Sequence, residues 1–390
     1  MKLDAVILCG GYGTRIKKFT KNKIPKSLIK INKKPFLDYL IKKICKYPFN
    51  KIIIIAGFKG KEISKLYNNK KINFTDIECI VEKKPLGTGY ALNNIKDKIK
   101  NDFVLFNGDT YFDYNLQNFF KKKLNKKHIA KIILTKNKKK SLTQNLLNMN
   151  LSSKNLIYFS KKSSLIGAGT IFFNKEIKKY ISKKSISLEG DILKKLIIKK
   201  KIVGEIDNSF FVDIGTENNL KYARKELPKL YYRPALFLDR DGVINKDLGH
   251  VHSKNKLIFN KNIIEKIKDF QKKKYFIFIV TNQAGIAKGY FTLNDFLNFQ
   301  KYIHTCLSKH GIFIDDIEFC PHHPNGKITK YKINCNCRKP ENGMIKNLQK
   351  KWDIDIKNSL FLGDRDTDKR CSEKSKIKFL MCKNNRIFFE

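Results

Sequence analysis

The chain has 390 residues and a formal net charge of +47, from 82 lysines and arginines against 35 acidic residues. This length exceeds what one hydrophobic core ordinarily supports, so we expect two domains, and an apolar content of 42% is enough to fill both. No apolar run reaches the roughly 18 residues of a membrane span, and the first apolar stretch is too short for a signal peptide. We therefore expect a cytoplasmic protein.

The positive charge is spread along the whole chain and does not form one stripe with interleaved aromatic residues. Abundant lysine, asparagine and isoleucine with scarce arginine are typical of coding DNA rich in A and T. A nucleic-acid-binding protein on inactive enzyme scaffolds is the alternative interpretation, and salt-sensitive DNA binding without turnover would support it. A basic surface would also attract phosphorylated substrates.

The first half of the chain alternates predicted strands with predicted helices. The strands are residues 4–9, 51–56, 77–81, 102–106 and 129–135, and the helices include 36–47 and 88–98. Alternation of this kind indicates a mainly parallel sheet with helices on both faces. Segment 136–165 is rich in lysine and serine and gives no clear pattern.

The stretch LPKLYYRP at 227–234 carries two prolines and interrupts the pattern. We place a linker at 227–233, between a domain at 1–226 and a domain at 234–390. The alternation then resumes. The predicted strands are 235–239, 275–280, 316–319 and 359–363, and the predicted helices are 261–273, 292–309 and 342–351. The expected fold class is α/β with two domains.

A glycine-rich loop, LCGGYGTR, follows the first predicted strand. Its Gly10, Gly11 and Gly13 would let backbone N–H groups approach a phosphate, although the spacing is neither that of a Walker loop nor that of a Rossmann loop. Four further motifs follow in order: PKSL at 25–28, EKKPLGTGYAL at 82–92, NGDTYF at 107–112 and FVDIGT at 211–216. Together these motifs resemble the sugar-1-phosphate nucleotidyltransferases over about residues 1–226, which implies a Rossmann-like, glycosyltransferase-A-like sheet.

The resemblance implies that a sugar 1-phosphate attacks the α-phosphorus of a nucleoside triphosphate and pyrophosphate leaves. Both partners are anions, so the site must cancel charge and align them. The glycine loop with Thr14 and Arg15 would hold the triphosphate, and Lys26 would neutralise the phosphates at the reacting centre. Asp109 and Asp213 would bind Mg²⁺, which prefers hard carboxylate oxygens.

Other residues of this half concern the base and the sugar. Gly87 resembles the turn that lies against the base, and Glu189 in SLEGD resembles the acid that holds sugar hydroxyls. The family often has Phe-x-Glu-Lys and Asn-Ala-Gly in its sugar region, where this chain has FSKK (159–162) and GAG (167–169). Lys162 would keep the lysine role. The stretch KIPKSLIKINKKPFLDYLI most resembles the subgroup that acts on heptose and mannose phosphates with GTP.

A second set of motifs begins with FLDRDGVIN, a predicted strand that ends in Asp239 and Asp241. Three more follow: TNQAG at 281–285, CRKP at 337–340 and GDRDTD at 363–368. The set resembles the haloacid dehalogenase-like phosphatases from 234 to about 382. It implies that Asp239 attacks phosphorus to form an aspartyl phosphate, while Asp241 protonates the leaving oxygen and then deprotonates water. Thr281 and Lys339 would bind the phosphoryl oxygens, with Asn282 beside them.

The same resemblance implies a second magnesium site. Asp364, Asp239 and the main-chain carbonyl of Asp241 would hold Mg²⁺, which offsets the repulsion between the nucleophile and the phosphate. Asp368 would orient this corner of the site. Arg338 would grip the phosphate that is not cleaved, because its planar fork suits bidentate contacts.

The segment CPHHPNGKITKYKINCNCRKP contains a C-x-H pair and a C-x-C pair. Cys320, His322, Cys335 and Cys337 make a closed four-ligand set that suits structural Zn²⁺, and His323 is an alternative to His322. The nine cysteines are otherwise scattered and odd in number, so they do not indicate a disulfide framework.

The zinc loop narrows the resemblance to the heptose-bisphosphate and histidinol-phosphate phosphatases. GHVHS at 249–253 is closer to the heptose-bisphosphate enzymes, although His250 replaces their usual tyrosine. A phosphatase of this kind would release heptose 1-phosphate, which a sugar-1-phosphate nucleotidyltransferase consumes. We therefore expect two consecutive steps of nucleotide-heptose synthesis, with GTP favoured because the HxGH turn of the ADP-heptose branch does not occur in the sequence.

Three alternatives stay open at this point. The first domain could use another sugar 1-phosphate, such as that of mannose or glucose, and the second could use histidinol phosphate. The fusion could reflect shared expression without channelling of the intermediate. The sequence does not indicate an oligomeric state. The expected partners are small molecules, namely heptose bisphosphate, heptose 1-phosphate and a nucleoside triphosphate.

Overall fold

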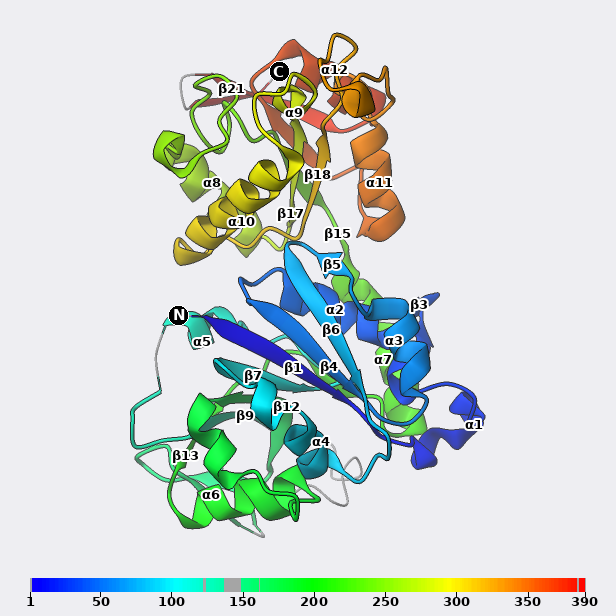
Figure 1. The fold of residues 1–390 in the computed structure, drawn as a ribbon, viewed down its shortest axis with the longest axis vertical. Coiled ribbons are helices and arrows are strands. Elements are labelled where there is room, and N and C mark those ends of the chain that lie inside the picture. Colours follow the sequence, from blue (N-terminus) through cyan, green and yellow to red (C-terminus); the bar gives the residue numbers. More distant parts are fainter. Residues whose placement is uncertain (1, 122–123, 137–148, 161, 384–385, 390) are drawn as a thin grey trace. The chain divides into compact units, whose positions relative to one another are not determined.

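The computed structural model describes residues 2–121, 124–136, 149–160, 162–383 and 386–389. The chain separates into two compact units, one made of Met1–Cys45 and Phe49–Pro228 and the other of Lys46–Pro48 and Lys229–Glu390 (Figure 1). Each unit contains a sheet with helices, so the expected two-domain α/β class is confirmed. The linker and domain limits given above stay predictions.

The first unit is built on one mixed sheet of ten strands. Its main path runs β11-β10-β12-β7-β1-β4-β6-β5, and β9 pairs with β12 and β13. The strands are β1 (Leu3–Cys9), β4 (Lys51–Ala56), β5 (Lys71–Ile72), β6 (Thr75–Val81), β7 (Asp102–Asn107), β9 (Ala130–Lys136), β10 (Met149–Leu151), β11 (Ile157–Phe159), β12 (Leu165–Phe173) and β13 (Ile202–Ile206). Strands β7, β1, β4 and β6 are parallel, and β12 joins β7 antiparallel.

The central strands of this sheet are apolar because helices cover both faces. All seven residues of β1 (LDAVILC) are buried, and in Figure 1 the strand lies between β4 and β7. Continuous apolar runs are typical of parallel strands that are buried on both faces. The helices of the unit are α1 (Lys17–Thr20), α2 (Phe36–Cys45), α3 (Gly60–Tyr67), α4 (Thr88–Asn94), α5 (Gln117–Lys121), α6 (Lys194–Ile198) and α7 (Glu217–Tyr231).

Two short pairs of strands complete the first unit: β2 (Lys30–Ile31) with β3 (Lys34–Pro35), and β8 (Thr110–Phe112) with β14 (Phe211–Asp213). The second pair matters for function, because it brings the NGDTYF and FVDIGT motifs side by side. The glycine-rich loop follows the carboxyl end of β1, and NGDTYF follows that of β7. Ligands of open α/β sheets bind at these ends of the strands.

The proline-containing stretch 227–234 differs from the expectation of a break. Helix α7 continues through Pro228 to Tyr231, and β15 (Tyr232–Arg233) follows and pairs with β19 (Asp353–Ile354). A proline removes one helical hydrogen bond, but burial of the apolar face of α7 offsets this cost. The buried side chains of that face are Leu220, Ala223, Leu227 and Tyr231. Of the unpatterned segment 136–165, residues 137–148 and 161 lie outside the described residues.

The second unit has a six-stranded sheet in the order β18-β17-β16-β20-β21-β22. All its strands are parallel except β22, which is antiparallel to β21. The strands are β16 (Ala235–Leu238), β17 (Phe276–Asn282), β18 (Asp316–Cys320), β20 (Leu360–Gly363), β21 (Lys378–Lys383) and β22 (Arg386–Phe389). The carboxyl ends of β16, β17 and β20 carry the DRDGVIN, TNQAG and GDRDTD motifs.

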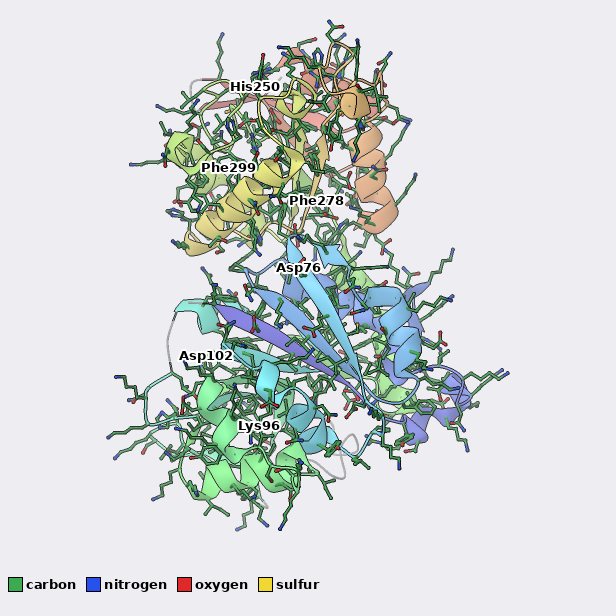
Figure 2. The ribbon with its side chains drawn as sticks, in the orientation of Figure 1. Asp76, Lys96, Asp102, His250, Phe278 and Phe299 are labelled. Carbon is green, nitrogen blue, oxygen red and sulfur yellow. The ribbon has the colours of Figure 1, made fainter. Side chains whose placement is uncertain are left out.

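Helices cover both faces of this second sheet. They are α8 (Lys261–Lys272), α9 (Ala284–Ala287), α10 (Leu293–Lys309), α11 (Gly343–Lys351) and α12 (Asp366–Lys374). Figure 1 shows α8 and α10 on one side of β17 and α11 on the other. Phe278 on β17 and Phe299 on α10, both labelled in Figure 2, are buried. No helix within the described ranges has the length and apolar character needed to cross a membrane.

Candidate active sites

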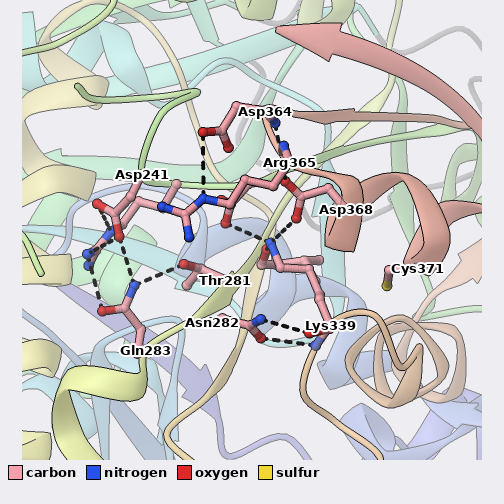
Figure 3. A network of polar contacts seen from close by, with 12 residues as sticks. Asp241, Thr281, Asn282, Gln283, Lys339, Asp364, Arg365, Asp368 and Cys371 are labelled. Carbon is pink, nitrogen blue, oxygen red and sulfur yellow. Dashed lines mark hydrogen bonds and ion pairs between the residues drawn. The ribbon is translucent and has the colours of Figure 1, made fainter. Parts of the chain in front are cut away.

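The carboxyl end of β16 carries a buried ion pair. Lys339 Nζ lies 2.8 Å from Asp239 Oδ1 and 2.6 Å from Asp368 Oδ1, and it donates to the Val280 carbonyl oxygen at 2.9 Å (Figure 3). Burial raises the pKa of Asp239 to about 7; the Lys339 charge opposes this rise and the Asp368 charge adds to it. Burial alone would lower the pKa of Lys339, but the two carboxylates hold it above its ordinary value. The ammonium group is therefore fixed in its charged form beside the expected nucleophile.

Asp241, two residues further along, is held by a different cation. Arg240 is fully buried, and its Nε and Nη2 donate to Asp241 Oδ1 and Oδ2 at 3.1 and 2.6 Å. Asn245 Nδ2 donates to Oδ1 at 2.9 Å, and Gln283 Nε2 donates to Oδ2 at 3.1 Å. Burial works against ionisation of Asp241, but Arg240 holds its pKa below the ordinary value. Two neighbouring carboxylates thus have pKa values shifted in opposite directions, and both shifts run against the expected roles, since a nucleophile must be ionised and a general acid protonated. A divalent cation beside Asp239 and an anionic phosphate beside Asp241 would each favour the form that its role requires.

A third carboxylate group, from Asp364, completes an acidic cluster. The cluster consists of Asp239, Asp364 and Asp368, whose carboxylate oxygens lie within 4.8 Å of one another. Among the described residues, Asp364 Oδ1 is buried without a hydrogen-bond partner, and burial with the nearby Asp368 charge raises the pKa of Asp364 to about 6. A clustered set of oxygens with an unused acceptor fits a hard divalent cation such as Mg²⁺.

The motif residues around this cluster are in contact with it. Asp368 Oδ2 accepts from the backbone N–H groups of Asp364 and Arg365 at 3.2 and 3.1 Å, so it orients the turn after β20. Gly242 has φ 89°, and a Cβ there would lie 2.1 Å from Asp364 Oδ2. Only glycine fits this close approach.

The side-chain amide of Asn282 forms two hydrogen bonds with the backbone of Lys339. Its Nδ2 donates to the Lys339 carbonyl oxygen at 3.1 Å, and its Oδ1 accepts from the Lys339 N–H at 3.0 Å. This reciprocal pair ties the end of β17 to the CRKP segment. Thr281, one residue earlier, is 1% exposed, and its Oγ1 accepts from Gln283 Nε2 at 2.9 Å.

A cleft of about 510 Å³ opens above these residues. Asp239, Asp241 and Lys339 line it together with the cationic side chains of Lys288, Arg338 and Arg365. The loop 247–250 forms part of its wall, where Asp247 pairs with Arg365. His250 also lines the cleft, and burial and the Lys288 charge lower its pKa. A cleft with carboxylates at its base and cations at its rim suits a phosphorylated ligand.

The three loop cysteines and one histidine form a compact cluster beside this cleft. The Sγ atom of Cys337 lies 3.1 Å from that of Cys335, 3.3 Å from that of Cys320 and 3.4 Å from His322 Nδ1. His323 is not part of the cluster, and its Nδ1 accepts from the backbone N–H of Asn325. Sulfur and imidazole ligands gathered from a C-x-H and a C-x-C pair fit a tetrahedral zinc ion.

The first unit has its own cluster of charges, between β8 and β14. Lys26 Nζ lies 2.5 Å from Asp109 Oδ2 and 3.7 Å from Asp213 Oδ1. Burial works against the ionisation of Asp109, but Lys26 holds its pKa below the ordinary value. Burial and the Asp109 charge raise the pKa of Asp213. Arg15 reaches the same place, because its Nη2 would lie 3.2 Å from a Cβ added to Gly215.

The glycine loop packs against the ends of β4 and β6. Gly13 has φ 66°, and the short helical turn with Thr14 follows it directly. A Cβ on Gly57 would lie 2.7 Å from Gly10 Cα and 2.8 Å from Glu82 Oε2, so the backbone of Gly10 lies directly against β4. A Cβ on Gly11 would meet nothing within 4 Å. The open side of the loop is therefore at Gly11.

The expected base and sugar residues come from two interlocked turns. Gly87 has φ 121°, and a Cβ there would lie 2.4 Å from the Ile186 carbonyl oxygen. Thr88 Oγ1 accepts from the Leu188 N–H at 2.9 Å and lies 3.4 Å from Glu189 Oε2. Glu189 lies in a π-helical turn, Leu188–Leu193, and such turns are frequent at functional sites. Lys162 is exposed in the turn before β12.

The structure adds contacts that the sequence analysis did not find. Arg240 belongs to the quoted motif FLDRDGVIN, and no role was predicted for it, yet it is buried and holds Asp241. Asn245 and Gln283 belong to the quoted motifs FLDRDGVIN and TNQAG, but no role was predicted for them. Their amide side chains, inside motifs that follow predicted strands, were the available signal.

Comparisons with known proteins match the two units to two families. The family described as "Nucleotidyl transferase" matches residues 4–229, and the family described as "Polynucleotide kinase 3 phosphatase" matches residues 237–386. D-glycero-beta-D-manno-heptose-1,7-bisphosphate 7-phosphatase of Photorhabdus laumondii is 40% identical over 144 residues, which cover 37% of this chain and 77% of that protein.

A second protein of Photorhabdus laumondii, D-glycero-alpha-D-manno-heptose-1,7-bisphosphate 7-phosphatase, is 39% identical over 141 residues, which cover 36% of this chain and 77% of that protein. Among solved structures, the crystal structure of HddC from Yersinia pseudotuberculosis is 26% identical with a TM-score of 0.49, and it covers 57% of this chain and 99% of that one.

Proposed function

Because the chain belongs to the nucleotidyl transferase family over residues 4–229 and, in its C-terminal part, to the family of heptose-bisphosphate phosphatases, we propose that it is a bifunctional enzyme of nucleotide-heptose synthesis. The second unit removes the 7-phosphate of D-glycero-D-manno-heptose 1,7-bisphosphate. The first unit joins the resulting heptose 1-phosphate to a nucleotide from GTP. One chain then carries two consecutive steps, because the product of the second unit is the substrate of the first.

The phosphatase proposal rests on the buried Asp239–Lys339 pair beside the separately held Asp241. Asp239 attacks phosphorus, the bond from phosphorus to the sugar oxygen breaks, and Asp241 gives that oxygen a proton. Asp241 then takes a proton from water, which attacks the aspartyl phosphate and releases phosphate. Lys339 and Thr281 bind the phosphoryl oxygens during both steps, and Arg338 binds the phosphate that stays on the sugar.

Two metals are part of this proposal. Asp239, Asp364 and the carbonyl of Asp241 would hold Mg²⁺, which offsets the repulsion between the nucleophile and the phosphate. The acceptor of Asp364 that has no partner among the described residues supports this assignment. Cys320, His322, Cys335 and Cys337 would hold structural zinc, and their packing in one cluster supports it.

In the first unit, the sugar phosphate oxygen attacks the α-phosphorus of GTP, and pyrophosphate leaves. Lys26 neutralises the phosphates, and Arg15 with the glycine loop holds them. Asp109 and Asp213 would bind Mg²⁺, which would neutralise charge on the phosphates. The convergence of Lys26 with both carboxylates supports this assignment. The sequence lacks the HxGH turn of the ADP-heptose branch, so we assign the first unit to the GDP branch and hence to the α-anomer. We place both steps in the cytoplasm, where nucleoside triphosphates and sugar phosphates are found.

To test this function, the purified protein is incubated with Mg²⁺, GTP and α-heptose 1,7-bisphosphate, and the products are identified by mass spectrometry. We expect GDP-heptose from the native protein. Asp239→Asn should give none unless heptose 1-phosphate is supplied, and Asp213→Asn should accumulate heptose 1-phosphate. Heptose 1-phosphate alone from the native protein would contradict the assignment of the first unit, and unchanged bisphosphate would contradict that of the second.

A further inference from the structure

Gln283 connects two groups of the phosphatase site, Asp241 and Thr281, through its side-chain amide. It follows β17 and is 3% exposed. Its Nε2 donates to Asp241 Oδ2 at 3.1 Å and to Thr281 Oγ1 at 2.9 Å, while its Oε1 accepts from Arg240 Nη2 at 3.2 Å (Figure 3). The amide thus lies between the proposed acid–base group and a proposed phosphate-binding group, with both N–H donors and its oxygen used.

The orientation of this amide is fixed from both ends. A guanidinium has only donors, so the atom that faces Arg240 must be the amide oxygen. An ionised carboxylate has only acceptors, so the atom that faces Asp241 must be the amide nitrogen. Arg240 is itself fixed, because Asp241 and the Val251 carbonyl oxygen accept from it at 2.6 and 2.7 Å. A flipped Gln283 would place donor against donor and acceptor against acceptor.

The fixed amide determines where the Thr281 hydroxyl points. Because Thr281 Oγ1 accepts from Gln283, its own proton is directed away from the amide. Within the described part of the chain, that proton has no acceptor, so it is available to a phosphoryl oxygen. Gln283 lines the cleft and lies 2.9 Å from Thr281 Oγ1, which places this hydroxyl next to the cleft wall.

We propose that Gln283 is a positioning residue of the phosphatase, which holds the Asp241 carboxylate and the Thr281 hydroxyl in the orientations that catalysis uses. The inference deepens the proposed function and rests on it, because the roles of Asp241 and Thr281 are part of that function. Gln283 itself exchanges no proton and forms no bond with the substrate.

The first experiment separates the effect on Asp241 by the choice of leaving group. The sugar oxygen of a sugar phosphate is a poor leaving group unless it receives a proton. Para-nitrophenolate is a good leaving group without one. A general acid therefore matters mainly for hydrolysis of the sugar phosphate. Gln283→Met keeps the length of the side chain and removes its donors. We expect kcat/KM to fall about tenfold for para-nitrophenyl phosphate, through the Thr281 hydroxyl that is no longer directed, and at least about tenfold further for heptose bisphosphate, since a hydrogen bond to a charged group contributes about that factor or more.

The second experiment isolates Thr281 through binding of inorganic phosphate, which needs no general acid. We expect Gln283→Met and Thr281→Val each to raise the inhibition constant of orthophosphate about tenfold, because each removes the same directed hydroxyl contact. The double variant should be no weaker than Thr281→Val alone, as expected for two residues that act through one contact. Thr281→Ser keeps the hydroxyl and should restore binding to near the native level.

Gln300 on α10 offers a matched control. It is fully buried like Gln283, but neither of its amide atoms has a hydrogen-bond partner among the described residues. Gln300→Met should therefore change neither the phosphate inhibition constant nor the leaving-group ratio. Folding of each variant is checked by the fluorescence of Trp352, the single tryptophan, which lies in the same unit. If Gln283→Met does not fold, Gln283→Glu replaces it, because the carboxylate keeps the contact with Arg240 but donates to neither partner.

Equal losses on both substrates, or multiplying effects in the double variant, would overturn the role of Gln283. Failure of the proposed function gives a different result. A native protein that cleaves para-nitrophenyl phosphate and glycerol phosphate but not heptose bisphosphate contradicts the proposed substrate. The leaving-group comparison is then made with glycerol phosphate, and it still decides the role of Gln283.

Discussion

The ammonium group of Lys339 lies 2.8 Å from the carboxylate of Asp239, and both side chains are buried. Replacement of Lys339 by methionine would leave Asp239 and Asp368 buried without their shared cation. Because breaking a buried ion pair strands a charge, we expect the free energy of unfolding of the second unit to fall by about 3–5 kcal/mol. Phosphate release should fall by about 10²–10³, since a fixed charge beside the phosphoryl group is lost. Urea unfolding followed by Trp352 fluorescence and a phosphate-release assay measure the two effects.

A double variant separates stability from catalysis. Lys339→Met combined with Asp368→Asn removes one of the two stranded charges, so it should recover part of the stability but none of the phosphatase activity. Near-native activity in either variant would show that Lys339 does not act on the phosphate.

The cysteine cluster predicts a metal dependence confined to the second unit. Cys337→Ser removes one of the four ligands, and we expect bound zinc to fall from about one ion per chain and phosphatase activity to be lost, because Lys339 lies two residues after Cys337. Nucleotidyl transfer from GTP to heptose 1-phosphate should continue. Cys306→Ser, which changes a thiol outside the cluster, is the control and should keep both the zinc and the activity. Zinc analysis of the purified variants with assays of both activities decides the point.

The glycine loop of the first unit predicts a packing effect on nucleotide binding. In Gly57→Ala, the new methyl group would lie 2.7 Å from Gly10 Cα, so the loop must shift. Overpacking of this kind costs about 1–3 kcal/mol, and we expect the KM for GTP to rise about tenfold or more while phosphatase activity stays at the native level. A Cβ on Gly11 would meet nothing within 4 Å, so Gly11→Ala should leave the thermal stability of the unit unchanged. An unchanged KM in Gly57→Ala would show that the loop position is not set by this contact.

The central strands of both sheets could be predicted because buried parallel strands have continuous apolar sequences, whereas strands such as β12, β13 and β21 were not among the predicted ones. KIIIIA at 51–56 and the strand before Asp239 are examples, and the structure has both. Helix α10 was predictable from a different signal, because Thr292 and Asp295 form a capping box at its expected start. The acidic residues that follow the strands were predictable from their motifs.

Features that depend on packing between distant segments could not be predicted in the same way. The choice of His322 over His323 depends on the path of the loop between the two cysteine pairs. The continuation of α7 through Pro228 depends on burial of its apolar face, which the local sequence signals do not report. The burial of Arg240 requires the side chains of Asp241, Gln283 and two phenylalanines, Phe296 and Phe299, to surround it.

The buried His304 on α10 predicts a loss of stability in acid. His304 is 3% exposed, and burial lowers its pKa from 6.5 to about 4. Between these two pKa values the unfolded chain binds a proton at this position and the folded chain does not, so the free energy of unfolding falls as the pH falls. From about pH 8 to about pH 5 this group alone should remove about 2 kcal/mol.

The comparison variant is His304→Gln, which has no titrating group at this position. Its free energy of unfolding, measured by urea titration with Trp352 fluorescence, should decline less than that of the native protein over the same pH range, by about 2 kcal/mol. Other groups contribute equally to both proteins, so the difference between the two curves isolates His304. Parallel curves would mean that His304 is protonated as easily in the folded chain as in the unfolded one.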